Sequence, residues 1–451
     1  MPWLGTIQSH GATLSFIILR EYSFSDMVVS MKRSNSGVSE DIFRAESLSC
    51  PFAAWKKVRD NDPVPWVTPP GSDEGAYLIT RRSDIEFVGR HPELFKSEVD
   101  ARVWRWGNDL HPELAAIIEE DGGYQIVHTI VTSDPPMAHR YRRIALEALS
   151  PPKIRAKVDE IQSLVDELIE QVPDNEAFDF REVFSVPLPL RVIMSAYGLP
   201  REDEPFVYDF TCAVINFVDP ITPLEQAKKD LRLIIRAQKY LAALIKEYRQ
   251  KPGDNFVSAI ANARDEEGNL LSVEETISLA LVTVIGGNET TRNALTTAAY
   301  VLARDKDLWQ ALKNDRDKVP AFIEELVRYG CPAIMTPRQA VEDTVLDGTP
   351  IHKGASVYVM WGAGSHDDSV FESPLEVRLE RPNIRQHTSF GSGVHHCAGV
   401  HLARKEMELS IQSWLENFKS MELAVPESEI VYAPTFTIRQ LFSLPLKVTK
   451  Y

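Results

Sequence analysis

The stretch that decides the fold is FGSGVHHCAG, residues 390–399. Its cysteine, Cys397, follows a glycine-rich bend and directly precedes apolar positions at helical spacing over residues 398–418. Backbone N–H groups at the start of a helix favour an anion, and a cysteine thiolate is an anion. A thiolate held in this way suits a soft or redox-active metal. The sequence therefore predicts a metal-binding thiolate at the beginning of a helix.

Two other interpretations apply to the same cysteine. A lone cysteine is usually a small, buried hydrophobic residue. His395, His396 and Cys397 could together ligate zinc, but adjacent residues fit tetrahedral zinc poorly. The sequence contains no Cys-x-x-Cys or His-x-x-x-His pair that could complete such a site.

Length and composition indicate one large domain. The chain has 451 residues, 44% of them hydrophobic, and no linker, repeat or low-complexity tract interrupts it after about residue 50. We therefore expect a single domain over residues 46–451. The formal net charge of −16 argues against nucleic-acid binding. Four scattered cysteines show no disulfide spacing, which fits a reducing cytosol.

The first 45 residues differ from the rest of the chain. They are polar, serine-bearing and weakly periodic, so we expect an N-terminal extension, with disorder as one possibility. The longest early apolar run, residues 14–19, is too short to span a bilayer. It also lacks the basic start and the cleavage site of a signal peptide. We expect a cytoplasmic protein with no membrane anchor.

Helical spacing of apolar residues dominates the sequence. It predicts helices over residues 153–172, 224–250, 272–304, 306–314, 320–330 and 398–418. Strand candidates are short and lie at residues 76–80, 344–346, 356–361, 435–438 and 444–448. This pattern predicts a mainly α fold with small β-sheets. It is not the regular strand–helix alternation of a doubly wound sheet.

The longest predicted helix carries an unusual interruption. Ser272 and Glu275 form a plausible capping box at its start. The run GGNETT at residues 286–291 then places two glycines in mid-helix, each costing roughly 1 kcal/mol relative to alanine. A helix accepts glycine where a ligand approaches its backbone, where it bends, or where another helix crosses closely.

Together these features resemble the cytochrome P450 family. The positions that match the family's heme-binding loop are Phe390, Gly393, His395, Cys397 and Gly399. The resemblance extends from about Cys50 to Leu446, is strongest from Ser272 onward, and is closest to soluble bacterial members such as the camphor-hydroxylating group. It implies the cytochrome P450 fold, heme b (iron protoporphyrin IX) as the cofactor, and Cys397 as the ligand of the iron.

The resemblance also implies roles for the interrupted helix. Gly286 and Gly287 would leave room for dioxygen bound at the heme. Thr290 would position water and relay protons, and the carboxyl group of Glu289 would replenish them. Because neighbours on a helix point in different directions, we expect Thr290 to face the heme and Glu289 to face a solvent channel.

Heme carries two carboxylates that need cations when they are buried. The resemblance implies three candidates, Arg142, Arg338 and His395. For Arg142 the alternative is a solvated helix face.

A Glu-x-x-Arg pair, Glu325 and Arg328, resembles a structural pair of the family. At this spacing on a helix the two side chains can meet. In the family an arginine completes the network. Glu376 stands where many members have that arginine, so we expect Arg378 or Arg381 to substitute.

The substrate pocket is predicted by analogy with the family. Residues 212–217 are expected to contribute from the roof of the pocket. The other expected lining residues are Val282, Ile285, Ala333, Ile334, Met335 and Phe436. Each could equally belong to the ordinary core. An apolar lining would hold a small to medium apolar substrate by shape.

The densest basic cluster in this acidic chain is His139–Arg143. In the family this region borders the surface where an acidic ferredoxin docks, and complementary charge speeds such docking. We expect a monooxygenase that hydroxylates its substrate with O2 and two electrons from a ferredoxin and its reductase. The alternatives are a peroxygenase that depends on hydrogen peroxide and a non-catalytic heme-binding sensor.

Overall fold

The protein is described by a computed structural model covering residues 37–451, apart from residues 71, 73, 108 and 266. Most of the expected N-terminal extension therefore lies outside the described residues. Packing begins before the expected boundary at residue 46, because Ile42 and Phe43 are already buried. Phe43 contacts Phe436 near the other end of the chain, with 4.8 Å between the ring centroids.

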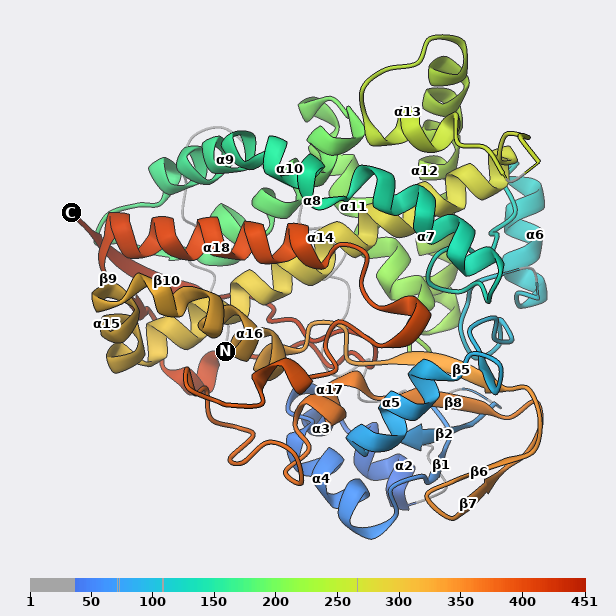
Figure 1. Ribbon diagram of the computed structural model, residues 1–451, viewed down its shortest axis with the longest axis horizontal. Coiled ribbons are helices and arrows are strands. Elements are labelled where there is room, and N and C mark those ends of the chain that lie inside the picture. The colour runs from blue at the N-terminus through green and yellow to red at the C-terminus, as the bar shows by residue number, and fades with distance from the viewer. Residues whose placement is uncertain (1–36, 71, 73, 108, 266) are drawn as a thin grey trace.

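Helices make up most of the described chain (Figure 1). In the first half they are α2 (Gly37–Ile42), α3 (Ala45–Ser49), α4 (Phe52–Asn61), α5 (Arg82–Arg90), α6 (Pro112–Glu120), α7 (Met137–Ala148), α8 (Pro151–Ala156), α9 (Val158–Gln171), α10 (Pro187–Tyr197) and α11 (Glu204–Val218). In the second half they are α12 (Leu224–Gln250), α13 (Phe256–Ala261), α14 (Val273–Arg304), α15 (Lys306–Asn314), α16 (Val319–Gly330), α17 (Trp361–Ser365) and α18 (Val400–Asn417). The predicted helices are confirmed, except that residues 153–172 form two helices separated at Lys157.

The strands are short and form small sheets. The largest sheet has the order β1-β2-β8-β5-β3, and a second has the order β4-β10-β9. Their strands are β1 (Trp66–Val67), β2 (Ala76–Ile79), β3 (Phe95–Lys96), β4 (Ala177–Asp179), β5 (Thr336–Ala340), β8 (Ser356–Val359), β9 (Phe418–Leu423) and β10 (Pro445–Lys450). β6 (Thr344–Leu346) pairs with β7 (Thr349–Ile351). The predicted strand over residues 435–438 is wrong, because only an isolated bridge between Ala333 and Ile438 forms there.

Helix α14 crosses the middle of the molecule, behind α18 in the view of Figure 1. Its predicted capping box is present, with Ser272 accepting from the backbone of Glu275 and Glu275 accepting from the backbone of Ser272. The helix continues without a break through Gly286 and Gly287. At Gly286 and Gly287 the helix therefore lacks side chains, but its backbone remains helical.

Three clusters of buried apolar side chains surround α14 and the sheets. One joins α14 to α9, α16 and α18, a second joins it to α10, α11 and α12, and a third packs α4 and α5 against the largest sheet. The predicted mainly α fold with small β-sheets is confirmed. Because α14 contributes to two clusters, residues on different faces of this one helix reach different parts of the core.

Candidate functional site

Cys397 lies in a tight loop that glycine makes possible. Its backbone N–H donates to the carbonyl oxygen of Phe390 at 2.8 Å, which closes the loop. Gly391 and Gly393 have φ angles of 69° and 64°, a region that glycine adopts at little cost. A Cβ atom on Gly393 would also lie 2.1 Å from the carbonyl oxygen of Gly89 in α5. The loop can therefore approach α5 only with glycine at this position.

The surroundings of the Cys397 sulfur combine burial with positive charge. Burial raises the pKa of the thiol, whereas a hydrogen bond from the backbone N–H of Gly399 and the cations Arg142 and Arg404 lower it. The sulfur also lies at the N-terminus of α18, where an anion is favoured. Burial is the largest of these effects, so a thiolate here needs a further cation. A metal ion bonded to sulfur supplies one.

Arg338, on β5, is buried and forms no ion pair among the residues that the structure describes, although the charge of Asp134 favours its charged form. Its guanidinium donates to the carbonyl oxygen of Pro337 at 2.7 Å and to the hydroxyl of Thr336 at 3.4 Å. Burial lowers the pKa of Arg338 to about 10. A buried charge is costly unless it is paired, so this guanidinium fits an anionic group such as a heme carboxylate.

Arg142 supports the cysteine loop. From α7 its guanidinium donates to the carbonyl oxygen of Val394 at 3.5 Å and also to that of His396. The residue is half-buried, so the alternative of a solvated helix face is not what the structure shows. These contacts place a positive charge behind the loop that carries Cys397.

His395 lies at the predicted place in the cysteine loop, with both ring nitrogens close to polar groups. Its Nδ1 lies 3.1 Å from the carbonyl oxygen of Ile130 and its Nε2 lies 2.8 Å from the hydroxyl of Ser97. A carbonyl can only accept, so Nδ1 donates to Ile130, and Nε2 shares a hydrogen bond with the Ser97 hydroxyl. Burial, followed by the charges of Arg338 and Arg142, lowers the pKa of His395 to about 3. A heme carboxylate beside the ring would oppose this shift, because an anion favours the charged imidazole.

The two glycines of α14 differ in their surroundings. Gly286 is exposed in mid-helix, and a Cβ atom there would meet nothing within 4 Å. Thr290 retains exposed surface one turn later, and its hydroxyl donates to the carbonyl oxygen of Gly286 at 2.8 Å. Gly287 instead approaches α10, where its Cβ atom would lie 2.9 Å from Ile193 Cδ1. Gly286 and Thr290 thus share an open face of the helix, and Gly287 permits a close helix contact.

Glu289 does not face a solvent channel, which corrects the expectation from sequence. It is 1% exposed and forms an ion pair with Arg292, one turn along α14. The Cys212 thiol lies 3.7 Å from its carboxylate, and Arg292 also donates to the side chain of Gln440 at 3.2 Å. The physical reason is the i,i+3 spacing, which places a guanidinium beside the carboxylate on the buried face of the helix.

Not all of the predicted pocket residues reach accessible space. Val282 and Ala333 are half-buried, and Ile285 is buried beside the open face of α14. Met335 is 1% exposed within the core cluster of the largest sheet. Ile334 and Phe436 line a separate cavity of about 10 Å³ that is otherwise bordered by α3, α4 and neighbouring loops. The packing of Met335, Ile334 and Phe436 therefore corresponds to ordinary core.

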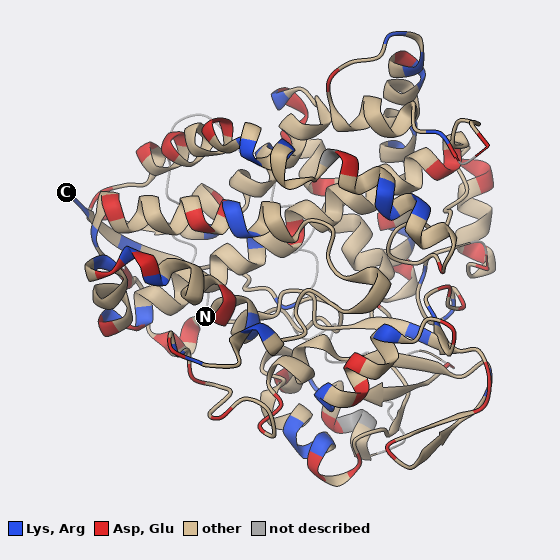
Figure 2. Cartoon of the chain, viewed as in Figure 1, with Lys and Arg blue, Asp and Glu red and all other residues tan. Residues whose placement is uncertain are grey.

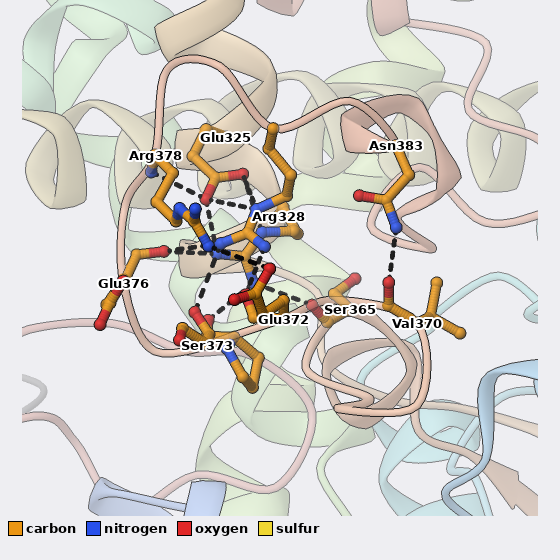
Figure 3. Close-up of polar contacts among 11 residues, drawn as sticks. Glu325, Arg328, Ser365, Val370, Glu372, Ser373, Glu376, Arg378 and Asn383 are labelled. Atoms are coloured by element: carbon orange, nitrogen blue, oxygen red, sulfur yellow. Dashed lines mark hydrogen bonds and ion pairs between the residues drawn. The ribbon is translucent and has the colours of Figure 1, made fainter.

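The predicted Glu–Arg pair forms a buried network (Figure 3). Arg328 donates to both oxygens of Glu325, at 2.9 and 2.8 Å. Arg381 is the third partner, because its Nε lies 2.9 and 3.1 Å from the same two oxygens. Arg378 contributes only its backbone N–H, at 3.0 Å. The remaining donors of the two buried arginines bind backbone carbonyls, among them that of Glu376, so the network fixes the segment before the cysteine loop against α16.

The basic cluster near α7 is less exposed than its composition suggests. His139 and Arg143 are exposed, whereas Arg140 lies 3.7 Å from Glu275 and Arg142 binds the cysteine loop. Figure 2 shows both basic and acidic segments on α18, which faces the same side of the molecule as α7.

Arg404 is a site residue that the sequence interpretation missed. It lies on α18, donates to Glu324 at 2.6 and 2.9 Å, and stacks over the Phe390 ring at 4.8 Å. The sequence does not reveal these contacts, because Arg404 joins Phe390 of the cysteine loop to α16, which lies far away in the sequence.

The zinc alternative from the sequence loses support. Within the described part of the chain, no three His, Cys, Asp or Glu side chains gather in a way that could hold a metal ion, which disfavours zinc. All four cysteines are free. A search of the same described residues finds no helix long and apolar enough to cross a membrane.

Comparisons with known proteins agree with this geometry. The family model for cytochrome P450 matches residues 115–431. The polyketide biosynthesis cytochrome P450 PksS of Bacillus subtilis is 30% identical over 408 residues, covering 89% of this chain and 96% of the relative. Linalool 8-monooxygenase of Pseudomonas putida is 28% identical over 374 residues, covering 83% and 90%. The crystal structure of CYP108D1 from Novosphingobium aromaticivorans superimposes with a TM-score of 0.80 at 26% identity, covering 92% of this chain and 98% of that one.

Proposed function

The chain belongs to the cytochrome P450 family of monooxygenases, whose members bind heme b, and from this premise we propose that it hydroxylates a small to medium apolar molecule. The electrons would come from a ferredoxin and its reductase. The observation that carries the proposal is Cys397, held at the start of α18 in a loop that glycine closes. We assign the activity to residues 46–451 as one domain.

The residues of the site fit heme. Cys397 would bind the iron through its sulfur, and the buried Arg338 would neutralise a heme carboxylate. Arg142 would hold the loop carbonyls, and His395 would lie beside Ser97 in the same loop. Bound heme supplies activation of dioxygen at iron, favoured by electron donation from the thiolate. The protein contributes position, charge and exclusion of water around that chemistry.

Thr290 is the proposed proton-relay residue. Its hydroxyl proton is directed to the carbonyl oxygen of Gly286, so its oxygen remains free to accept from water on the open face of α14. Glu289 would reach the relay only after leaving Arg292, because the ion pair holds its carboxylate on the buried face of α14. The hydroxyl therefore takes the direct role and the carboxyl a secondary one.

The substrate class follows from the open face of α14 and from the relatives. Val282, Ile285 and Ala333 offer an apolar lining in which shape decides orientation. The names of two relatives refer to linalool and to polyketide biosynthesis. Both names support an apolar organic substrate. A ligand screen would identify the individual molecule.

Electron delivery is proposed at the surface around α7. His139 and Arg143 are exposed there on a chain whose formal net charge is −16. An acidic ferredoxin is repelled by most of such a protein, so a local basic surface favours docking at one place.

The proposal is tested by comparing three conditions on one substrate panel. A monooxygenase consumes NAD(P)H with ferredoxin and reductase and forms product, whereas a peroxygenase works with hydrogen peroxide alone. A sensor does neither. Peroxygenases usually lack an acid–alcohol pair beside the heme, so Glu289 and Thr290 speak against one. Because Glu289 is held in a buried ion pair, that argument is weakened and the condition with hydrogen peroxide alone is informative. Product from peroxide but not from NAD(P)H would overturn the proposal.

Thr290→Ala sharpens the test. We expect NAD(P)H consumption to continue while product falls and hydrogen peroxide appears, because the relay hydroxyl is lost. Thr297→Ala is the matched control, since its hydroxyl also donates to a carbonyl oxygen of α14, that of Asn293, but is buried. Fully coupled turnover in Thr290→Ala would contradict the role.

A further inference from the structure

Glu289 is almost completely enclosed, although the proposed relay at Thr290 consumes protons that come from solvent. The Glu289 side chain is 1% exposed, and one of its carboxylate oxygens pairs with Arg292. The other oxygen lies 3.7 Å from the sulfur of Cys212 on α11, which donates to it. A proton therefore reaches this carboxylate through a neighbouring group and not directly from bulk water.

The arginine and amide groups around Glu289 cannot pass a proton on. Arg292 forms the ion pair, and Arg181 is also buried and feels the charge of Glu289. A guanidinium holds its protons too tightly to exchange them within a protein. Gln440, which accepts from Arg292 at 3.2 Å, carries an amide that does not ionise. Among these four neighbours, only the Cys212 thiol can both give and take a proton.

Tyr208 lies beside Cys212, one turn nearer to the start of α11. Its ring centroid is 5.6 Å from the guanidinium carbon of Arg292, so it belongs to the same cluster. Burial and the charge of Glu289 raise the pKa of the Cys212 thiol to about 11. The charge of Arg292 and a hydrogen bond with the Tyr208 hydroxyl lower that pKa, and a hydrogen bond with this effect is donated to the sulfur. The donors therefore point one way, from Tyr208 through Cys212 to Glu289.

One face of α11 leads from this cluster to solvent. Glu204, Tyr208 and Cys212 are spaced four residues apart, so their side chains lie one above the other along the helix. Glu204 lies at the outer end, 3.9 Å from the guanidinium of Arg201, whose side chain is 52% exposed. Tyr208 keeps some accessible surface in the middle. Tyr208 and Cys212 thus form a polar row that links the exposed start of α11 to Glu289.

We propose that the polar row of Tyr208 and Cys212 carries protons to Glu289, and that both are positioning residues which act through this carboxylate. The inference rests on the proposed function, since it takes Glu289 as the group that supplies Thr290. In one concerted step the thiol proton passes to the carboxylate oxygen, the phenol proton passes to the sulfur, and a hydronium ion returns a proton to the phenol oxygen. The net change is one proton moved from solvent to Glu289. The neutral carboxyl group pairs more weakly with Arg292, which frees it to turn toward Thr290.

The first test measures proton delivery in the holoenzyme, as the rate of product formation in light and in heavy water. We expect Cys212→Ala and Tyr208→Phe to slow product formation roughly 100-fold, the low end for loss of a positioned proton donor, and to raise the solvent isotope effect. Cys212→Ser should recover most of the rate, because a hydroxyl also gives and accepts a proton. Tyr240→Phe is the control, since that phenol donates to Asp203 at 2.7 Å and not toward Glu289. An unchanged rate and isotope effect in Cys212→Ala would overturn the route.

The second test needs no turnover and reads the polar row by infrared spectroscopy, because the S–H stretch absorbs apart from other protein groups. Cys212→Ala identifies the band of this thiol. Glu289→Gln should shift the band to higher frequency, since an amide accepts a hydrogen bond more weakly than a carboxylate. Tyr208→Phe should also shift the band, because the donor to the sulfur is lost. A band that responds to neither change would show ordinary packing and overturn the proposal. Absence of heme or of product in the wild-type protein would instead defeat the proposed function, because the band still tests the polar row.

Discussion

At the residue scale, the position of Cys397 depends on the absence of a side chain at Gly393. This glycine combines a φ angle of 64° with a contact that a Cβ atom would bring to 2.1 Å from a carbonyl oxygen. The charged neighbours, Arg142 and Arg404, act on a loop whose path the glycine has already determined. The thiolate site therefore requires both a backbone that glycine permits and cations that only folding brings together.

Gly393→Ala tests this dependence. The left-handed backbone alone costs roughly 1 to 2 kcal/mol, and the overlap with Gly89 adds to it, so we expect lower thermal stability and less bound heme. Gly354→Ala is the matched control, because Gly354 has a φ angle of 83° but open space around its Cβ position. Equal loss of stability in the two variants would show that the close approach to α5 is unimportant.

The sequence predicted some residues of the site better than others. Cys397 and its glycines could be predicted because their spacing lies within ten residues. The i,i+3 spacing of Glu289 and Arg292 in the sequence allows an ion pair. The spacing alone does not show that this face of α14 is buried. The partners of Arg142 and Arg404 could not be predicted, because each contact joins segments that only the fold brings together.

At the element scale, α16 is fixed to the segment before the cysteine loop by the network around Glu325. One carboxylate serves Arg328 and Arg381, all three side chains are buried, and the other donors of the arginines bind backbone carbonyls (Figure 3). Arg381 reaches the carboxylate, whereas the guanidinium of Arg378 lies 3.6 Å from the exposed Glu372. The sequence limited the third partner of the network to Arg378 or Arg381. The structure selects Arg381, whose side chain is buried beside Glu325.

Glu325→Gln should therefore be severely destabilising. Removing one member of a buried ion network leaves two guanidinium groups without a counter-charge, which costs about 3–5 kcal/mol. We expect a large drop in the denaturant midpoint and loss of bound heme. Glu422→Gln removes one carboxylate from an exposed ion pair with Lys306 and should change the midpoint little. Similar midpoints for the two variants would contradict a structural role for the network.

Helices were predicted more accurately than strands for a physical reason. The long helices bury one face, so their apolar spacing is visible in the sequence. Strands such as β1 and β3 contain two residues each, too few for any alternation to appear. The single predicted helix over residues 153–172 divides at Lys157, where the apolar spacing alone gives no sign of a break.

At the scale of the whole molecule, charge is unevenly distributed. The chain has 65 acidic and 49 basic residues, yet α7 presents basic segments on the side seen in Figure 2, where α18 carries basic and acidic segments together. The same side carries the cysteine loop, since α18 begins directly after it. Electrons delivered there would reach the proposed heme by a short path.

Arg143→Glu tests the proposed docking surface. We expect slower electron transfer from an acidic ferredoxin and a weaker dependence on ionic strength, because the exposed charge at this position is reversed. Lys306→Glu makes the same change of charge on α15 and should leave the rate close to that of the wild type. Transfer rates that do not respond to salt in the wild-type protein would contradict electrostatic docking.

The central claim is that the sulfur of Cys397 binds heme iron. The most direct measurement is the absorption spectrum of the reduced, carbon-monoxide-bound protein, together with its heme content. The account predicts one heme per chain and the red-shifted Soret band of thiolate ligation, lost in Cys397→Ser and kept in Cys50→Ser, which changes an exposed cysteine. A wild-type protein without heme, or a thiolate spectrum that survives in Cys397→Ser, would contradict it.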